Sequence, residues 1–194
     1  MKMKYLFAII ATLAMIACAS SAIVHSGVNT VGQMRISTES EWHSMTKSDT
    51  PESNGLTRTW TKNGLPQDRL ILIAGIKDGS PILKNGGEAF RPTMSASELQ
   101  HLVQSSIPAL TGTSSSTLQI RDEREQNFGL NAGVFFEFSA GAASQGSAGA
   151  FVFEDALYVN LFLATDADAF AAVGAEAEAV ILSATGNIKT IRMH

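Results

Sequence analysis

The chain has 194 residues, of which 45% are hydrophobic and 16% charged, and its formal net charge is −4. This length suits one domain with a substantial core. The acidic balance and the lack of a Lys/Arg-rich run argue against nucleic-acid binding, because a phosphate backbone requires clustered cations. We therefore expect one globular domain that binds no nucleic acid.

The N-terminal segment has the pattern of a bacterial secretory signal. Two lysines precede the apolar run Tyr5–Ile16, whose 12 residues are fewer than the ~20 that a membrane span needs. Ala14-Met15-Ile16-Ala17-Cys18 resembles a bacterial lipobox, although Met replaces the usual Leu. The resemblance implies that residues 1–17 are a signal peptide and that Cys18 becomes the lipidated mature N-terminus.

Cysteine usage agrees with a lipid anchor. Cys18 is the only cysteine, so the mature domain has no internal disulfide, and acylation would consume the thiol. In lipoproteins, a residue other than Asp after the cysteine, here Ala19, implies sorting to the outer membrane. We expect a lipid-anchored protein of the cell envelope, at the outer membrane facing the periplasm. The alternative is ordinary cleavage at Ala17-Cys18-Ala19, which would release a soluble periplasmic or secreted protein.

The mature chain begins with a segment of low complexity. Residues 18–32 are mostly Ser, Ala, Gly, Asn and Val without a period, which predicts a flexible tether. We expect a single α+β domain over residues 33–186, with a first strand near Met34–Ile36 and Trp42 as a core anchor. Residues 187–194 are expected to form a C-terminal tail.

Two strands and a helix follow. Leu56–Trp60 alternates in character, and Arg69–Ile76 is almost continuously apolar, which predicts a central strand buried on both faces. A capping box, Ser95 with Glu98, then begins a helix with an apolar stripe. Pro108 and Gly112 are expected to end this helix.

The second half of the chain is rich in strand signals. After a short strand over 117–120 and the charged run 121–125, three segments combine aromatic and β-branched residues. These segments are 134–138, 150–153 and 157–163, and their short connections favour antiparallel pairing. Residues 139–149, which are mostly Gly, Ala and Ser, are expected to form a flexible hairpin loop.

A second helix is predicted to begin near Thr165 or Asp166. Acidic residues suit the positive N-terminal end of a helix dipole. An apolar stripe follows, and Gly186 is the expected C-cap. Adjacent Phe135 and Phe136 point to opposite faces of their strand, so both faces of the sheet should be covered.

Over residues 34–185, this order of strands and helices resembles the PsbP-like α+β domain, which also occurs in uncharacterised bacterial lipoproteins. The resemblance implies an antiparallel sheet of about six to seven strands flanked by two main helices. It rests on the order of elements and carries over no functional residue. Domains of this kind act mostly by binding proteins or small ligands, so the resemblance implies a binding function by analogy.

One strand face is the candidate ligand or partner groove. Glu137 lies between two phenylalanines, and Arg58 or Arg69 could lie opposite it on a neighbouring strand. Tyr158, Asn160 and Phe162 share one face of a later strand. We interpret Glu137, Tyr158, Asn160 and Phe162 as a groove for a protein partner or a small apolar ligand. The more ordinary explanation of Glu137 is a solvated carboxylate or a cross-strand ion pair.

The sequence holds no complete catalytic, cofactor-binding or metal-binding motif. Ser44-Met45-Thr46-Lys47 matches S-x-x-K without its companion elements, and no His pair has metal-ligand spacing. Asp166 and Asp168 lack the remainder of a calcium loop. The leading hypothesis is a non-enzymatic, lipid-anchored binding domain. The alternatives are a periplasmic hydrolase whose site assembles only in three dimensions, with Ser44, His101 and Glu137 as candidates, and a purely structural envelope lipoprotein.

Overall fold

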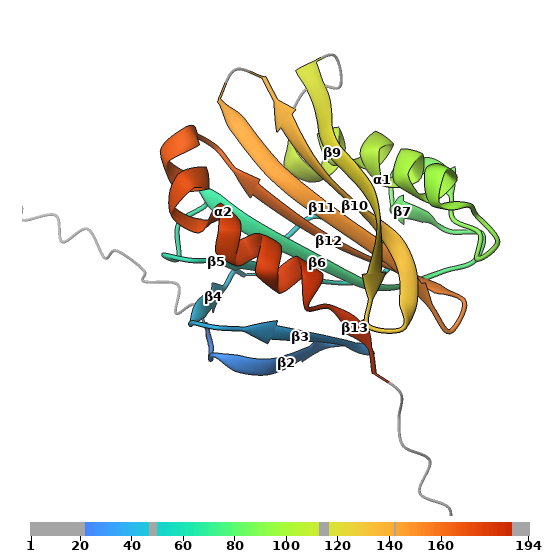
Figure 1. The fold of residues 1–194 in the computed structure, drawn as a ribbon, viewed down its shortest axis with the longest axis horizontal. Coiled ribbons are helices and arrows are strands. Elements are labelled where there is room, and N and C mark those ends of the chain that lie inside the picture. The colour runs from blue at the N-terminus through green and yellow to red at the C-terminus, as the bar shows by residue number, and fades with distance from the viewer. Residues whose placement is uncertain (1–21, 47–49, 113–116, 142, 188–194) are drawn as a thin grey trace, which may run out of the picture.

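The dominant element of the structure is a large antiparallel sheet. A computed structural model describes residues 22–46, 50–112, 117–141 and 143–187. Eight strands form the main sheet in the order β1-β4-β5-β6-β12-β11-β10-β9, and all neighbours are antiparallel (Figure 1). In that order, the strands are β1 (Ala22–Val24), β4 (Trp42–Ser44), β5 (Leu56–Thr61), β6 (Asp68–Lys77), β12 (Ala156–Ala164), β11 (Ser144–Phe153), β10 (Asn131–Ala140) and β9 (Leu118–Phe128).

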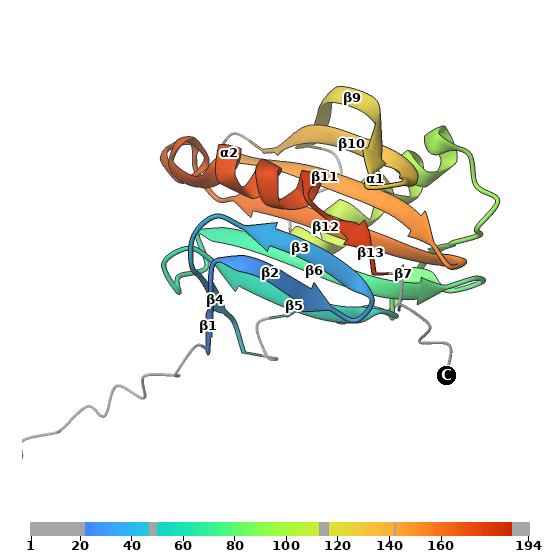
Figure 2. The ribbon, with the colours of Figure 1, turned by 60° about the horizontal axis from the view of Figure 1, so that its bottom comes forward.

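Different elements cover the two faces of this sheet. Helix α2 (Ala167–Leu182) covers one face together with a three-stranded sheet, which lies beside α2 over β5 and β6 in Figure 2. Helix α1 (Ala96–Thr111) covers the other face together with a hairpin. The three-stranded sheet has the order β13 (Thr185–Gly186), β3 (Met34–Thr38), β2 (Gly27–Val31), and the hairpin pairs β7 (Pro81–Leu83) with β8 (Gly86–Ala89). The predicted α+β class with two main helices is confirmed, with eight strands in the main sheet.

Alternation along β12 divides the core into two apolar clusters. Leu157, Val159, Leu161 and Leu163 belong to the cluster under α1, whereas Tyr158 and Phe162 belong to the cluster under α2. Strand β6 alternates in the same way, with Ile71 and Ile73 on the α1 side and Leu70 and Leu72 on the α2 side. Because both faces are buried, these strands read as nearly continuous apolar runs.

Both helices begin where the sequence predicts. Ser95 and Glu98 form the capping box of α1, and Asp166 caps α2 by accepting a hydrogen bond from the Ala169 backbone N–H at 2.7 Å. Helix α1 continues through Pro108 and ends at Gly112, which is left-handed with φ 74°. Among the described residues, no helix has the length and hydropathy to cross a membrane.

The expected Gly186 C-cap is wrong. Helix α2 ends at Ser183, and Gly186 pairs with Met34 in the three-stranded sheet. A Cβ at Gly186 would lie only 2.3 Å from the Phe153 ring, so close packing accounts for glycine at this position.

The predicted flexible tether over residues 18–32 is wrong for residues 22–31. These residues form β1, which pairs with β4, and β2, which pairs with β3. Only Val31 of this stretch is fully buried, so no alternation of buried and exposed apolar residues marks the strands. The domain therefore includes residues from Ala22 onward, ahead of the expected start at Gln33.

The predicted loop over residues 139–149 is mostly strand. Residues 144–149 belong to β11, and their small side chains are required by packing. A Cβ at Gly146 would lie 2.1 Å from the Phe162 backbone oxygen, and one at Gly149 would lie 2.6 Å from the Ile181 side chain. The low side-chain volume allows Phe138, Phe162 and α2 to pack closely on β11.

The charged run 121–125 also lies within a strand. It belongs to edge strand β9, which extends well beyond the predicted 117–120 and contains a β-bulge opposite β10. Asp122 lies at this bulge with φ 48°. Charges and bulges on an edge strand disfavour pairing with another chain.

We predict that Gly146→Ala destabilises the protein by about 1–3 kcal/mol, because the added methyl group overpacks β11 against the β12 backbone. Ser144→Ala in the same strand is the matched control and should change the unfolding free energy by less than ~0.5 kcal/mol. Urea denaturation measures both. Equal effects of the two substitutions would show that β11 does not pack closely at Gly146.

Candidate functional site

The four predicted groove residues share one face of the sheet, but most of that face is covered. The register aligns Phe162, Ser147 and Glu137 across three strands, on the side that carries α2. Tyr158, Asn160 and Phe162 are at most 1% exposed. Phe162 lies 6.3 Å from the Phe170 ring of α2, centroid to centroid. These residues therefore line a closed core, and the predicted open groove is wrong.

Glu137 and Tyr158 have different neighbours from those expected. Glu137 is half-buried and lies opposite Arg121 of β9 in the register, so the suggested pairing with Arg58 or Arg69 is wrong. The Tyr158 ring stacks on Phe151 at 5.1 Å, and its hydroxyl donates to Gln33 Oε1 at 3.3 Å. Burial raises the pKa of Tyr158, and the Glu154 carboxylate adds to this shift.

Two polar side chains beneath α2 lack hydrogen-bond partners. Asn160 is fully buried with both amide atoms unpaired, and Ser147 is 3% exposed with an unpaired hydroxyl. They lie on neighbouring strands, because Ser147 pairs with Phe162 and Gly149 pairs with Asn160. A buried, unpaired polar group costs free energy, so these residues weaken the core.

A half-buried polar cluster connects α2 to the hairpin between β5 and β6. Lys62 Nζ lies 2.7 Å from Glu176 Oε1 and also contacts the Ser40 hydroxyl, which itself donates to Glu176. The Lys62 ammonium lies 5.1 Å from the centre of the buried Trp42 ring. This cluster fixes the N-terminal strands against the helix.

Burial and hydrogen bonding act in opposite directions on the carboxylates here. Desolvation alone would raise the pKa of Glu176, but hydrogen bonds from Lys62 and Ser40 outweigh it and lower the pKa. Burial raises the pKa of Asp68, although the Lys62 backbone N–H donates to its carboxylate at 2.7 Å. The arrangement is that of a structural ion pair rather than of an acid–base pair.

A second ionic contact holds α2 to the opposite edge. Arg124 of β9 lies 3.1 Å from Glu178 of α2 and also pairs with Asp122. Its guanidinium lies 4.2 Å from the centre of the Phe135 ring. Part of the charged run is therefore engaged with the helix.

The candidate catalytic residues do not converge. Ser44 ends β4, and His101 is an exposed residue of α1 whose Nδ1 lies 3.7 Å from Glu88. Glu137 faces the α2 side, so the sheet lies between it and His101. Four strands lie between β4 and β10, which places these strands about 24 Å apart at the usual strand spacing.

The remaining motif fragments are the S-x-x-K match and the acidic residues before α2. Lys47 of the S-x-x-K match lies outside the described residues, and Ser44 is in a strand instead of beginning a helix. Asp166 is the N-cap of α2. Within the ranges that the structure describes, no cluster of three or more His, Cys, Asp or Glu residues suits a metal ion.

The structure instead reveals a pocket beside β5. Strand β4 pairs only with Thr61 and Trp60 of β5, and one further bond follows, from the Met45 N–H to the Thr59 carbonyl at 2.8 Å. The pairing with β5 ends there, and residues 50–55 form a loop on the same side of β5. Asn54 holds this loop against β7, with its side-chain nitrogen 2.9 Å from the Pro81 carbonyl oxygen. The space between the loop and β5 remains open.

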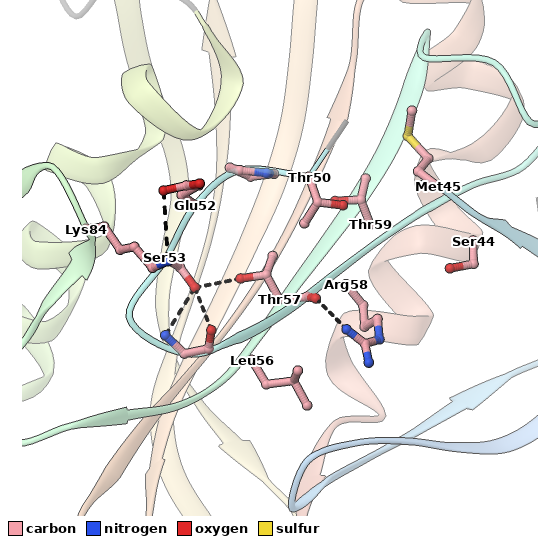
Figure 3. A pocket seen from close by; sticks show the side chains of 12 residues that line it. Ser44, Met45, Thr50, Glu52, Ser53, Leu56, Thr57, Arg58, Thr59 and Lys84 are labelled. Atoms are coloured by element: carbon pink, nitrogen blue, oxygen red, sulfur yellow. Dashed lines mark hydrogen bonds and ion pairs between the residues drawn. The ribbon is translucent and has the colours of Figure 1, made fainter. Parts of the chain in front are cut away.

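This pocket has a volume of about 540 Å³, within the range of small-molecule sites. Its lining is rich in hydroxyl groups and is drawn in Figure 3. The lining residues are Ser44, Met45, Thr50, Pro51, Glu52, Ser53, Gly55, Leu56, Thr57, Arg58, Thr59 and Lys84. We call it the β5 pocket.

The polar groups of the β5 pocket are only partly satisfied. The Ser53 and Thr57 hydroxyls lie 2.5 Å apart, and Arg58 donates to the Thr57 carbonyl at 3.0 Å. Thr59 is 1% exposed, and its hydroxyl has no partner. Lys84 Nζ lies 3.9 Å from the Glu52 carboxylate, which is a loose ion pair. The exposed side chains of Arg58 and Lys84 are the donors that a ligand can reach.

Backbone direction adds a further donor. The Thr59 carbonyl points toward β4, so by the alternation of a strand the Thr57 N–H and carbonyl also point away from β6. In the part of the chain that the structure describes, no strand pairs with Thr57 on that side. This pocket was not predicted from the sequence. The alternating hydroxyls of Thr57, Thr59 and Thr61 were the available signal.

Comparisons with known proteins support the fold alone. No protein-family model and no curated protein matches the chain. The solution structure of cyanobacterial PsbP (CyanoP) from Synechocystis sp. PCC 6803 matches with a TM-score of 0.51 and 11% identity, over 91% of this chain and 98% of that chain. The fold is PsbP-like. This result confirms the resemblance inferred from the order of the elements, and at 11% identity it assigns no ligand to the β5 pocket.

We predict that Glu176 stabilises the protein above about pH 5 and loses this effect in acid. Its folded-state pKa lies below the ordinary value of 4.5, so its contribution is complete above 4.5 and disappears as the pH falls through the folded-state pKa. The difference in unfolding free energy between wild type and Glu176→Gln should therefore shrink below pH 4.5. Glu125→Gln on edge strand β9 is the control. A difference in unfolding free energy that grows below pH 4.5 would contradict a lowered pKa for Glu176.

We predict that Ser147→Ala leaves the unfolding free energy unchanged or slightly raises it, because the buried hydroxyl has no partner. Ser53→Ala is the matched control, since its hydroxyl bonds to Gly55 and Thr57, and it should cost about 1 kcal/mol. Chemical denaturation compares the two. A loss of stability in Ser147→Ala equal to that of the control would mean that Ser147 is hydrogen-bonded after all.

Proposed function

We propose that the chain is a lipid-anchored binding domain of the bacterial cell envelope and that the β5 pocket is its binding site. The observation that carries this proposal is the pocket itself, which has a ligand-sized volume and a lining of Ser and Thr hydroxyls with two cations, Arg58 and Lys84. A concave site with this polar lining favours a polar ligand. The small apolar ligand expected from the sequence has less support.

The alternative of a periplasmic hydrolase has no supporting geometry in the described residues. Catalysis by a serine nucleophile requires a base within hydrogen-bond reach. Ser44 lies in the β5 pocket wall, whereas His101 is an exposed residue of α1. Glu137 is on the face of the sheet opposite to the face that α1 covers. A binding role therefore fits the arrangement better than a hydrolytic one.

The anchor part of the proposal rests on the N-terminal sequence. The lipobox-like segment ends at Cys18, which lies outside the described residues, and Ala19 favours sorting to the outer membrane with the domain facing the periplasm. Strand β1 begins at Ala22, four residues after the cysteine. A soluble periplasmic or secreted protein is the alternative outcome of the test below.

We predict that the wild-type chain, expressed in a bacterium with a fatty-acid analogue, becomes labelled and sediments with the membrane fraction. Cys18→Ala should lose the label and leave the chain in the soluble fraction or unprocessed, because the thiol is the acylation site. Ser20→Ala is the matched control. Intact mass of the mature protein measures the modification directly. An unmodified Cys18 in a processed, soluble protein would contradict the anchor.

A further inference from the structure

The position of β1 determines where the domain meets its anchor. Ala22 pairs with Ser44, and the antiparallel register points the N-terminal end of β1 in the direction of Met45. Ser44 and Met45 both line the β5 pocket. Ala22, the first described residue, therefore lies beside residues of the pocket wall.

The spacing between Cys18 and Ala22 keeps the pocket close to the anchored end. Four residues span at most about 14 Å even when fully extended. A domain of this size has a radius of gyration of about 15 Å, so such a tether is short relative to the domain. If Cys18 carries a lipid, as proposed above, the β5 pocket lies next to the membrane surface.

The charge of the pocket differs from that of the whole chain. The protein has a net charge of −4, yet the pocket wall contains two cations, Arg58 and Lys84, and one carboxylate, Glu52. Its lining also includes Ser and Thr hydroxyls, and the Thr57 N–H lies on the open strand edge. Two cations with neutral N–H and O–H donors form a suitable environment for a phosphate ester.

We propose that the β5 pocket binds the phosphate head group of a membrane phospholipid in the leaflet that holds the anchor. The proposal rests on the proposed function, because the anchor supplies the proximity. Anchoring makes the encounter with head groups intramolecular, with an effective concentration in the millimolar range. A shallow, half-open site with few donors is sufficient at such a concentration. Binding would orient the domain with its β1–β4–β5 end toward the bilayer.

The test uses the full-length lipidated protein in vesicles of phosphatidylethanolamine and phosphatidylglycerol that carry a photoactivatable head group. Mass spectrometry of the crosslinked peptides should place most crosslinks on residues 44–46, 50–59 and 84. The double variant Arg58→Ala/Lys84→Ala should reduce these crosslinks about tenfold, as expected for the loss of charge-assisted contacts. The matched control, Arg35→Ala/Lys77→Ala, removes two exposed cations outside the pocket and should leave them unchanged.

Each failure of this experiment has a separate meaning. Crosslinks spread evenly over the surface, or equal in the two double variants, would overturn the head-group site while leaving the anchor intact. Loss of the pocket crosslinks at micromolar glycerol 3-phosphate would overturn the lipid as ligand, because a soluble phosphate ester would then occupy the site. An unmodified Cys18, found by intact mass in the same preparation, would overturn the anchor and with it the head-group site.

Discussion

The structure depends on the burial of both faces of the central strands. Strands β6 and β12 contribute alternate residues to two separate apolar clusters, one closed by α1 and the other by α2 with the three-stranded sheet. Complete burial of a large apolar side chain is worth about 1.5–3 kcal/mol, so these strands form the most stable part of the domain. The glycines of β11 serve the same constraint, because they let the covering layers approach the sheet.

Burial from both sides leaves the sheet edges as the places available for function. At one edge, β9 has a bulge and several charges, and Arg124 is engaged with α2. Near the other edge, β4 covers only the end of β5, and the remaining length of β5 forms one wall of the pocket. Two ionic contacts, centred on Lys62 and Arg124, hold α2 across the sheet. These contacts fix α2 on the sheet, and the β5 pocket is the site at which we propose that a ligand binds.

Local signals in the sequence predicted the central elements well and the edges poorly. Alternation along 157–163 and the capping box at Ser95 depend on neighbouring residues, so both could be predicted directly. Strands β1 and β2 could not, because only Val31 of the two strands is fully buried and so no apolar alternation marks them. The residues of β11 resembled a loop because the need for glycine comes from Phe162 and Ile181, which are distant in sequence. The β5 pocket combines three segments that are separated in sequence, so no local pattern indicates it. The groove predicted from the sequence lay on other strands.

The central claim is that a sheet closed on both faces leaves one side of β5 open as a binding edge. Residue-resolved amide hydrogen exchange tests it most directly, because adjacent residues of β5 point their N–H groups in opposite directions. The backbone N–H of Arg58 points to β6 and should exchange slowly. The backbone N–H of Thr57 points to the pocket side and should exchange at least ~100-fold faster. Equal protection of Thr57 and Arg58 in the ligand-free protein would show that the edge is already paired, and the account of the β5 pocket would be wrong.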